Sequence, residues 1–189
     1  MPPGQHVTTD FPILSAGPMP RIAPESWTLA LQHGGRLLDT WTRAEFLSLP
    51  QTTVSADIHC VTKWSKLGTT WRGVTFDDLL KAAGLAEPPA PYVMAHCDGA
   101  YTTNLAVADL TGRQRHDRDP LRRSAACAGL APAHGGPARL FVPQLYFWKS
   151  GQVDSPASLH GRERAGLLGT SGDITSMATL GKNSAMPGD

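Results

Sequence analysis

The thiol of Cys60 is the side chain whose type and surroundings point most clearly to chemistry. From Val54 to Cys60 apolar and polar residues alternate, which indicates a half-buried strand that delivers the thiol at its end. Lys63 and Trp64 follow directly, and we expect a turn at Lys66-Leu67-Gly68. A thiol beside a positive charge is readily held as thiolate, the form that attacks substrates or binds a soft metal. A buried structural cysteine is the alternative that local chemistry leaves open.

Four other groups of residues could take part in binding or catalysis, and each also has an ordinary structural explanation. In His134 to Arg139 two glycines allow a ligand to approach the backbone and the guanidinium suits a phosphate, but a turn before a strand explains the motif equally well. Tyr146 to Ser150 is consistent with packing beside a lysine whose ammonium reaches solvent. His96 and Cys97 suggest a zinc or thiol site, although no second pair lies at zinc-finger spacing. Gly99 to Asn104 offers polar donors for a pocket.

The elements that must position these residues are short strands and short helices, in no regular alternation. Strands are predicted at Trp27–Gln32, Arg36–Leu38, Val54–Cys60, Tyr92–His96 and Arg139–Val142, and helices at Arg43–Leu47, from Thr75 to Gly84, and at Ala106–Leu110. The arginine-rich stretch 112–131 and the stretch 151–189, rich in Gly, Ser and Thr, indicate loop or disorder. The pattern predicts an α+β fold of mixed short-strand sheets with short helices.

Composition excludes several classes of protein. With 17 basic and 16 acidic residues in 189, nothing electrostatic favours nucleic acid or an anionic membrane. No apolar run approaches the roughly 18 residues of a membrane span. Met1 to Pro20 lacks the features of an export signal, and three cysteines without framework spacing suit a reducing compartment, so we expect a cytoplasmic protein.

Four stretches together resemble the molybdopterin-binding domain of the sulfite oxidase family, particularly its small bacterial oxidoreductases. The stretches are DFPILSAGP from Asp10, DIHCVTKWSKLGTTWRGV from Asp57, YTTNL from Tyr101 and HGGPARLFVPQLYFWKS from His134. They stand in the family's order and cover most of residues 9–150.

The resemblance implies roles that spacing alone does not. It places Cys60 as the single protein ligand of molybdenum, with the pterin dithiolene supplying the other sulfurs, as suits a soft metal. It also implies that the pterin and its phosphate are bound by Leu14, Ser15, Ala16, His134, Arg139 and Ser150. Lys63, as a second catalytic residue, and Thr103 complete the predicted pocket.

The similarity to this family ends abruptly after Ser150. Gln152 stands where the family has a phosphate-holding lysine, and the family's aromatic C-terminus is missing. Codons compatible with the printed residues encode family-like strings when they are read in another frame. We therefore hypothesise that residues 114–131 and 151–189 are translated out of frame, and that resequencing the gene would show this.

These observations predict a molybdopterin-binding oxidoreductase domain at 1–150 and an atypical, poorly ordered tail at 151–189. The predicted reaction is oxygen-atom transfer or another two-electron redox step on a small, sulfur-containing substrate, with a Mo-molybdopterin cofactor. Electrons would pass to a separate haem or flavin protein. The alternative is a non-catalytic remnant that cannot retain the cofactor.

Overall fold

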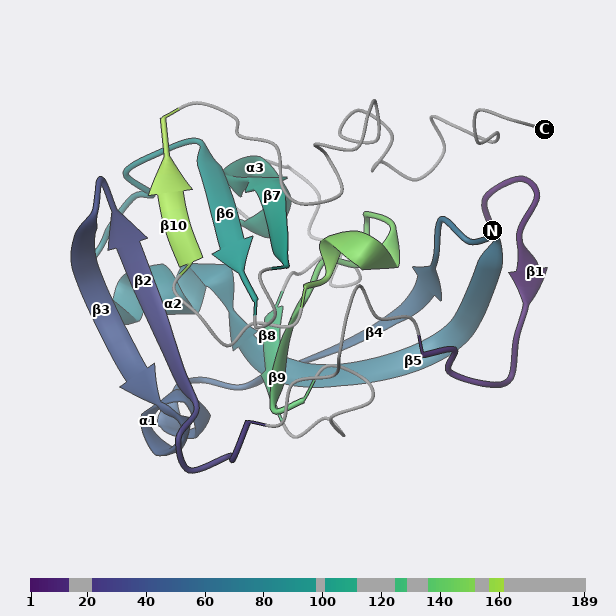
Figure 1. Ribbon diagram of the computed structural model, residues 1–189, viewed down its shortest axis with the longest axis horizontal. Coiled ribbons are helices and arrows are strands. Elements are labelled where there is room, and N and C mark those ends of the chain that lie inside the picture. The colour runs from purple at the N-terminus through teal and green to yellow at the C-terminus, as the bar shows by residue number, and fades with distance from the viewer. Residues whose placement is uncertain (14–21, 98–100, 112–124, 129–135, 152–156, 162–189) are drawn as a thin grey trace.

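The computed structural model describes residues 1–13, 22–97, 101–111, 125–128, 136–151 and 157–161 (Figure 1). Ten strands in two five-stranded sheets occur in these ranges. The first sheet contains β1 (His6–Val7), β4 (Thr52–His59), β5 (Trp64–Thr75), β8 (Ala125–Ala128) and β9 (Ala138–Phe141). The second contains β2 (Thr28–His33), β3 (Arg36–Thr42), β6 (Tyr92–His96), β7 (Thr102–Ala106) and β10 (Ala157–His160). Short helices accompany them: α1 (Arg43–Ser48), α2 (Phe76–Ala82), α3 (Val107–Leu110) and the 3-10 helix η4 (Phe147–Lys149).

The α+β prediction is confirmed, and the local signals that predicted the helices act as expected. The Thr42 hydroxyl accepts a hydrogen bond from the Glu45 amide, and the Glu45 carboxylate accepts one from the Thr42 amide. This reciprocal capping begins α1. At the start of α2 the Thr75 hydroxyl accepts a hydrogen bond from the Asp78 amide, and Gly84 follows the end of that helix at a φ of +73°.

The long strand β5 organises the first sheet. It pairs with β4 along most of its length, with β1 at its beginning and with β8 at its end. In Figure 1 β4 and β5 form a curved ribbon that runs from beneath the second sheet out to β1. The turn predicted at 66–68 is wrong: β5 continues through these residues because Lys66 pairs with Ile58 on β4.

Two stretches predicted as irregular contribute strands. Ala125–Ala128 forms β8 between β5 and β9, which corrects the prediction of loop or disorder for those residues. Ala157–His160 forms β10, which lies between β2 and β6. The division into a domain of residues 1–150 and a tail stays a prediction, although β10 belongs to the second sheet.

Two clusters of buried apolar side chains form the core. The larger combines side chains of the second sheet and of α1, α2 and α3 with some from β5, β8 and β9, and it includes Trp27, Phe46 and Leu80. The smaller packs β4 and β5 against η4 and includes Cys60. The chemistry-bearing residues lie in and around this smaller cluster.

Candidate cofactor site

Cys60 lies where β4 ends and the chain reverses into β5. The Cys60 amide donates to the Trp64 carbonyl at 2.9 Å, and the Lys63 amide donates to the Cys60 carbonyl at 3.1 Å. Lys63 closes this turn with a φ of +67°, a conformation that few residues other than glycine adopt. The strand end predicted at Cys60 is therefore present, with the reversal at residues 60–63. The Lys63 side chain is exposed on this turn.

The Cys60 side chain packs among apolar residues, and a hydroxyl group donates a hydrogen bond to its sulfur. Its exposed fraction is 5%, and the Thr62 hydroxyl donates a hydrogen bond to its sulfur at 3.1 Å. The wall is a cluster that we call the aromatic cluster, formed by Val54, Ile58, Trp64, Trp71, Ala125, Phe141 and Phe147 together with Phe11. The Phe147 ring lies 6.2 Å from Trp64 and 5.7 Å from Phe11 between ring centres. Such walls exclude water from the surroundings of the sulfur.

Arg139, on β9, contacts the same aromatic cluster through Phe147. Its guanidinium carbon lies 4.2 Å from the centre of the Phe147 ring, and its Nε donates to the Ser150 carbonyl at 2.6 Å. Burial lowers the pKa of Arg139 to about 10, while Tyr101, Cys97 and Cys60 act in the opposite direction. The guanidinium therefore keeps its charge at neutral pH, in a partly buried position where the Cys60 thiol influences its pKa.

The β6–β7 hairpin packs against Gly151 beside this pair. A Cβ atom built on Gly151 would lie 2.9 Å from Cys97 Sγ, 3.1 Å from Thr103 Cγ2 and 3.7 Å from Tyr101 Cε1. The Tyr101 hydroxyl donates to the Trp148 carbonyl at 2.6 Å. Burial raises the pKa of Tyr101 well above its ordinary value, and Cys97 and Cys60 raise it further. The phenol therefore stays protonated and neutral.

Lys149 is a functional feature that sequence reasoning missed. The sequence suggested a lysine whose ammonium reaches solvent, and this is wrong, because the residue is only 3% exposed. Its Nζ donates to the Asn104 carbonyl at 2.8 Å and to Asn104 Oδ1 at 2.7 Å, and lies 4.5 Å from the centre of the Trp148 ring. The polar groups that hold the ammonium come from β7, which the local sequence pattern does not reveal.

Ser150 is also buried, and both its hydroxyl oxygen and its carbonyl oxygen accept hydrogen bonds. Its hydroxyl oxygen accepts from the Val142 amide at 3.1 Å, while its carbonyl accepts from Arg139. The hydroxyl proton of Ser150 is not used in the Val142 bond, so this group remains able to donate.

Several buried polar atoms near these residues have no hydrogen-bond partner within the described ranges. They include Thr103 Oγ1, Trp64 Nε1 and Trp148 Nε1, and the Thr103 side chain is fully buried. A buried donor without a partner costs about 1–3 kcal/mol, so a polar ligand that met these atoms would be stabilised. The described residues also contain no group of three His, Cys, Asp or Glu side chains that could hold a metal ion. The Cys60 thiol, the Arg139 cation and these unsatisfied donors fit a cofactor that brings most of its metal's ligands with it.

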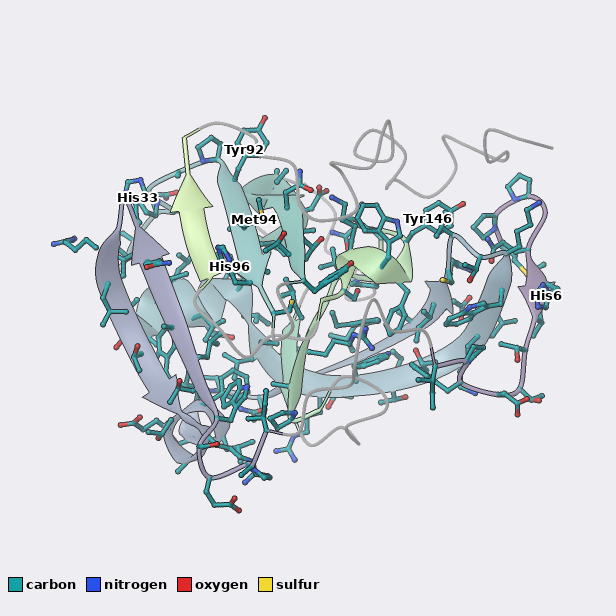
Figure 2. The ribbon with its side chains drawn as sticks, in the orientation of Figure 1. His6, His33, Tyr92, Met94, His96 and Tyr146 are labelled. Carbon is teal, nitrogen blue, oxygen red and sulfur yellow. The ribbon has the colours of Figure 1, made fainter. Side chains whose placement is uncertain are left out.

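The remaining predicted residues are not all brought together here. Leu14, Ser15, Ala16 and His134 lie outside the described residues. His96 ends β6 among the strands of the second sheet, whereas Tyr146 lies beside η4 (Figure 2). Burial raises the pKa of Tyr146, and Cys60 adds to this effect, so Tyr146 belongs to the electrostatic surroundings of the thiol.

Comparisons with known proteins bear on the family and the fold of this chain. Residues 16–153 match the family model of the oxidoreductase molybdopterin-binding domain. The uncharacterized oxidoreductase YuiH of Bacillus subtilis (strain 168) is 36% identical, in an alignment that covers 79% of this chain and 74% of the relative. The crystal structure of the sulfane dehydrogenase SoxCD from Paracoccus pantotrophus shares the fold, with a TM-score of 0.61 and 15% identity.

The SoxCD alignment covers 79% of this chain and 41% of that structure's chain. Among the described helices, none has the length and apolar character that crossing a bilayer requires. The family match spans more than half of the chain, and the relative with 36% identity covers most of it. This chain therefore belongs to the oxidoreductase molybdopterin-binding domain family, the sulfite oxidase family, and is an oxidoreductase of that kind.

Proposed function

We propose that the chain is a molybdenum-cofactor oxidoreductase in which the Cys60 thiolate is the one protein ligand of the metal. Arg139, Ser150 and Thr103, with His134 and the segment from Leu14 to Ala16, hold the pterin and its phosphate. When bound, the cofactor supplies two-electron redox chemistry, including oxygen-atom transfer. The substrate we propose is small and sulfur-containing, in line with the sulfane named for the structure of similar fold.

The observation that carries this proposal is that Cys60 and Arg139 share one apolar cluster, which contains Phe147. The thiol belongs to the aromatic cluster that contains Phe147, and the guanidinium stacks on that ring. A thiolate and a cation on one apolar wall suit a ligand with a soft metal at one end and an anionic group at the other.

The chain's own residues have separable tasks in this proposal. The aromatic cluster keeps water from the sulfur, and the partly buried guanidinium stays cationic toward an anionic group. Thr103 Oγ1 offers a hydroxyl that the described protein groups leave unsatisfied. Electrons leave to a separate haem or flavin protein, and a cytoplasmic location stays a prediction based on cysteine use.

Metal analysis of the purified chain tests this function. Protein made in cells that synthesise the cofactor should contain nearly stoichiometric molybdenum, and Cys60→Ser should lose it. Cys97→Ser is the matched control, because Cys97 is also a buried free thiol and should leave the molybdenum content unchanged. Wild-type protein that is folded but free of molybdenum would instead support the non-catalytic remnant. Metal lost in Cys97→Ser and kept in Cys60→Ser would favour the thiol site at Cys97.

A further inference from the structure

A chain of hydrogen bonds lies behind Cys60, on its backbone side. Gln5 Nε2 donates to the Cys60 carbonyl at 2.9 Å. The Ser65 hydroxyl donates to Gln5 Oε1 at 3.0 Å, and its oxygen lies 2.8 Å from His59 Nδ1. None of these partners contributes to the pterin-binding set described above.

The direction of every bond in this chain follows from its first member. A carbonyl only accepts, so the Gln5 amide nitrogen must face Cys60 and its oxygen must face Ser65. Ser65 has a single hydroxyl proton, which goes to Gln5, so its oxygen accepts from His59 Nδ1–H. A single arrangement of protons therefore satisfies all three hydrogen bonds.

The same N-terminal segment holds the rest of the turn through its backbone. The His6 amide donates to the Lys63 carbonyl at 2.9 Å, and the Thr8 amide donates to the Ser65 carbonyl at 2.9 Å. Figure 2 shows His6 on β1, beside the end of the β4–β5 ribbon. Gln5 adds the only side-chain contact of this segment with Cys60 that the described hydrogen bonds include.

We propose that Gln5 is a positioning residue that fixes the peptide plane of Cys60 and so the direction of its thiol. This role rests on the proposed function, in which that thiol binds the metal. Two amides converge on the Cys60 carbonyl, from Lys63 within the turn and from Gln5 outside it. Of these two donors Gln5 is the one that comes from another segment of the chain, so its loss removes one tie to that segment and leaves those made by the His6 and Thr8 amides.

Gln5→Glu tests this role because it keeps the shape of the side chain and the oxygen that faces Ser65. The carboxylate has no N–H for the Cys60 carbonyl. Gln51→Glu is the matched control: Gln51 is also half-buried, and its Nε2 also donates to backbone carbonyls, those of Phe46 and Leu49. Ser65→Ala is a second variant, which removes the donor to Gln5 Oε1.

The readout is the rate at which iodoacetamide alkylates Cys60 and Cys97 in the metal-free chain, followed by peptide mass spectrometry. In Gln5→Glu the Cys60 rate should rise about five- to tenfold, the change in local opening that one lost hydrogen bond produces. Ser65→Ala should raise it in the same direction, and the Cys97 rate should stay constant in both. Neither rate should change in Gln51→Glu.

An unchanged Cys60 rate in Gln5→Glu would overturn the inference, and so would an equal rise at Cys97, which would indicate general loosening of the fold. The alkylation needs no cofactor. Failure of the proposed function would therefore show separately, as the absence of molybdenum from the wild-type chain.

Discussion

The contact between Gly151 and Cys97 gives a prediction whose size can be worked from the structure. Gly151→Ala places a methyl group 2.9 Å from Cys97 Sγ and 3.1 Å from Thr103 Cγ2. Ordinary contacts between such atoms lie at about 3.5–4.0 Å. Cys97 and Thr103 are buried, so neither side chain can move freely into solvent. The substitution therefore forces a shift inside the packed interior.

Two opposing terms set the change in the free energy of unfolding that Gly151→Ala causes. Overpacking of an interior costs about 1–3 kcal/mol. Gly151 has no positive φ, so alanine adopts its backbone conformation without strain. Restriction of the unfolded chain by alanine then stabilises the protein by about 0.4–1 kcal/mol. The single substitution should destabilise the protein by about 1.3 kcal/mol, the midpoint of a difference that runs from about 0 to about 2.6 kcal/mol.

A double-mutant cycle separates the two terms. In a Cys97→Ala background the sulfur is gone, and Gly151→Ala should cost less than in the wild type by about 1 kcal/mol or more. Urea unfolding of the four proteins, followed by tryptophan fluorescence under reducing conditions, supplies the values. Additive effects, within about 0.5 kcal/mol, would refute the claim that Cys97 Sγ occupies the space of a Cβ at position 151.

Two other predictions concern buried polar groups near the site. Lys149→Met removes both hydrogen bonds to Asn104 and should lower the free energy of unfolding by about 2–4 kcal/mol. Lys66→Met, which removes an exposed bond to the Thr9 carbonyl, should cost less than about 1 kcal/mol, and equal costs in urea unfolding would contradict the buried position of Lys149. Because burial raises the pKa of Tyr101, the folded chain keeps the phenol proton above pH 10, where the unfolded chain loses it. Stability should therefore fall as pH rises above 10, with a contribution of up to about 1.4 kcal/mol per pH unit from this group. Tyr101→Phe should show a smaller fall in thermal unfolding, and identical pH profiles would count against the assignment.

Local sequence patterns predicted the elements whose signals are themselves local. Thr42 with Glu45 and Thr75 with Asp78 begin helices through contacts three residues apart, so the sequence carries the whole signal. The period of two from Val54 to Cys60 also predicted the strand end correctly. His59 departs from that period: it is buried, because Ser65 and Gln5, from other segments, supply a polar partner chain.

Strands without a local signal were missed for a corresponding reason. Ala125–Ala128 has no alternation and lies in an arginine-rich stretch, yet it pairs on both sides, with β5 and β9. Ala157–His160 likewise gains its place from β2 and β6. Backbone hydrogen bonds from flanking strands stabilise such segments whatever their intrinsic preference.

The sequence by itself determined the family, the single thiol at position 60 and the helix caps, because each depends on residue identity within a short window. Only the tertiary structure decided what surrounds that thiol. Phe147 shares an apolar cluster with Cys60, Arg139 stacks on Phe147, and Gln5 donates to the Cys60 carbonyl. These residues come from distant parts of the chain, and no local pattern encodes their contacts. It also decided that the ammonium of Lys149 is buried rather than solvated, since Asn104 on β7 provides the oxygens that hold it.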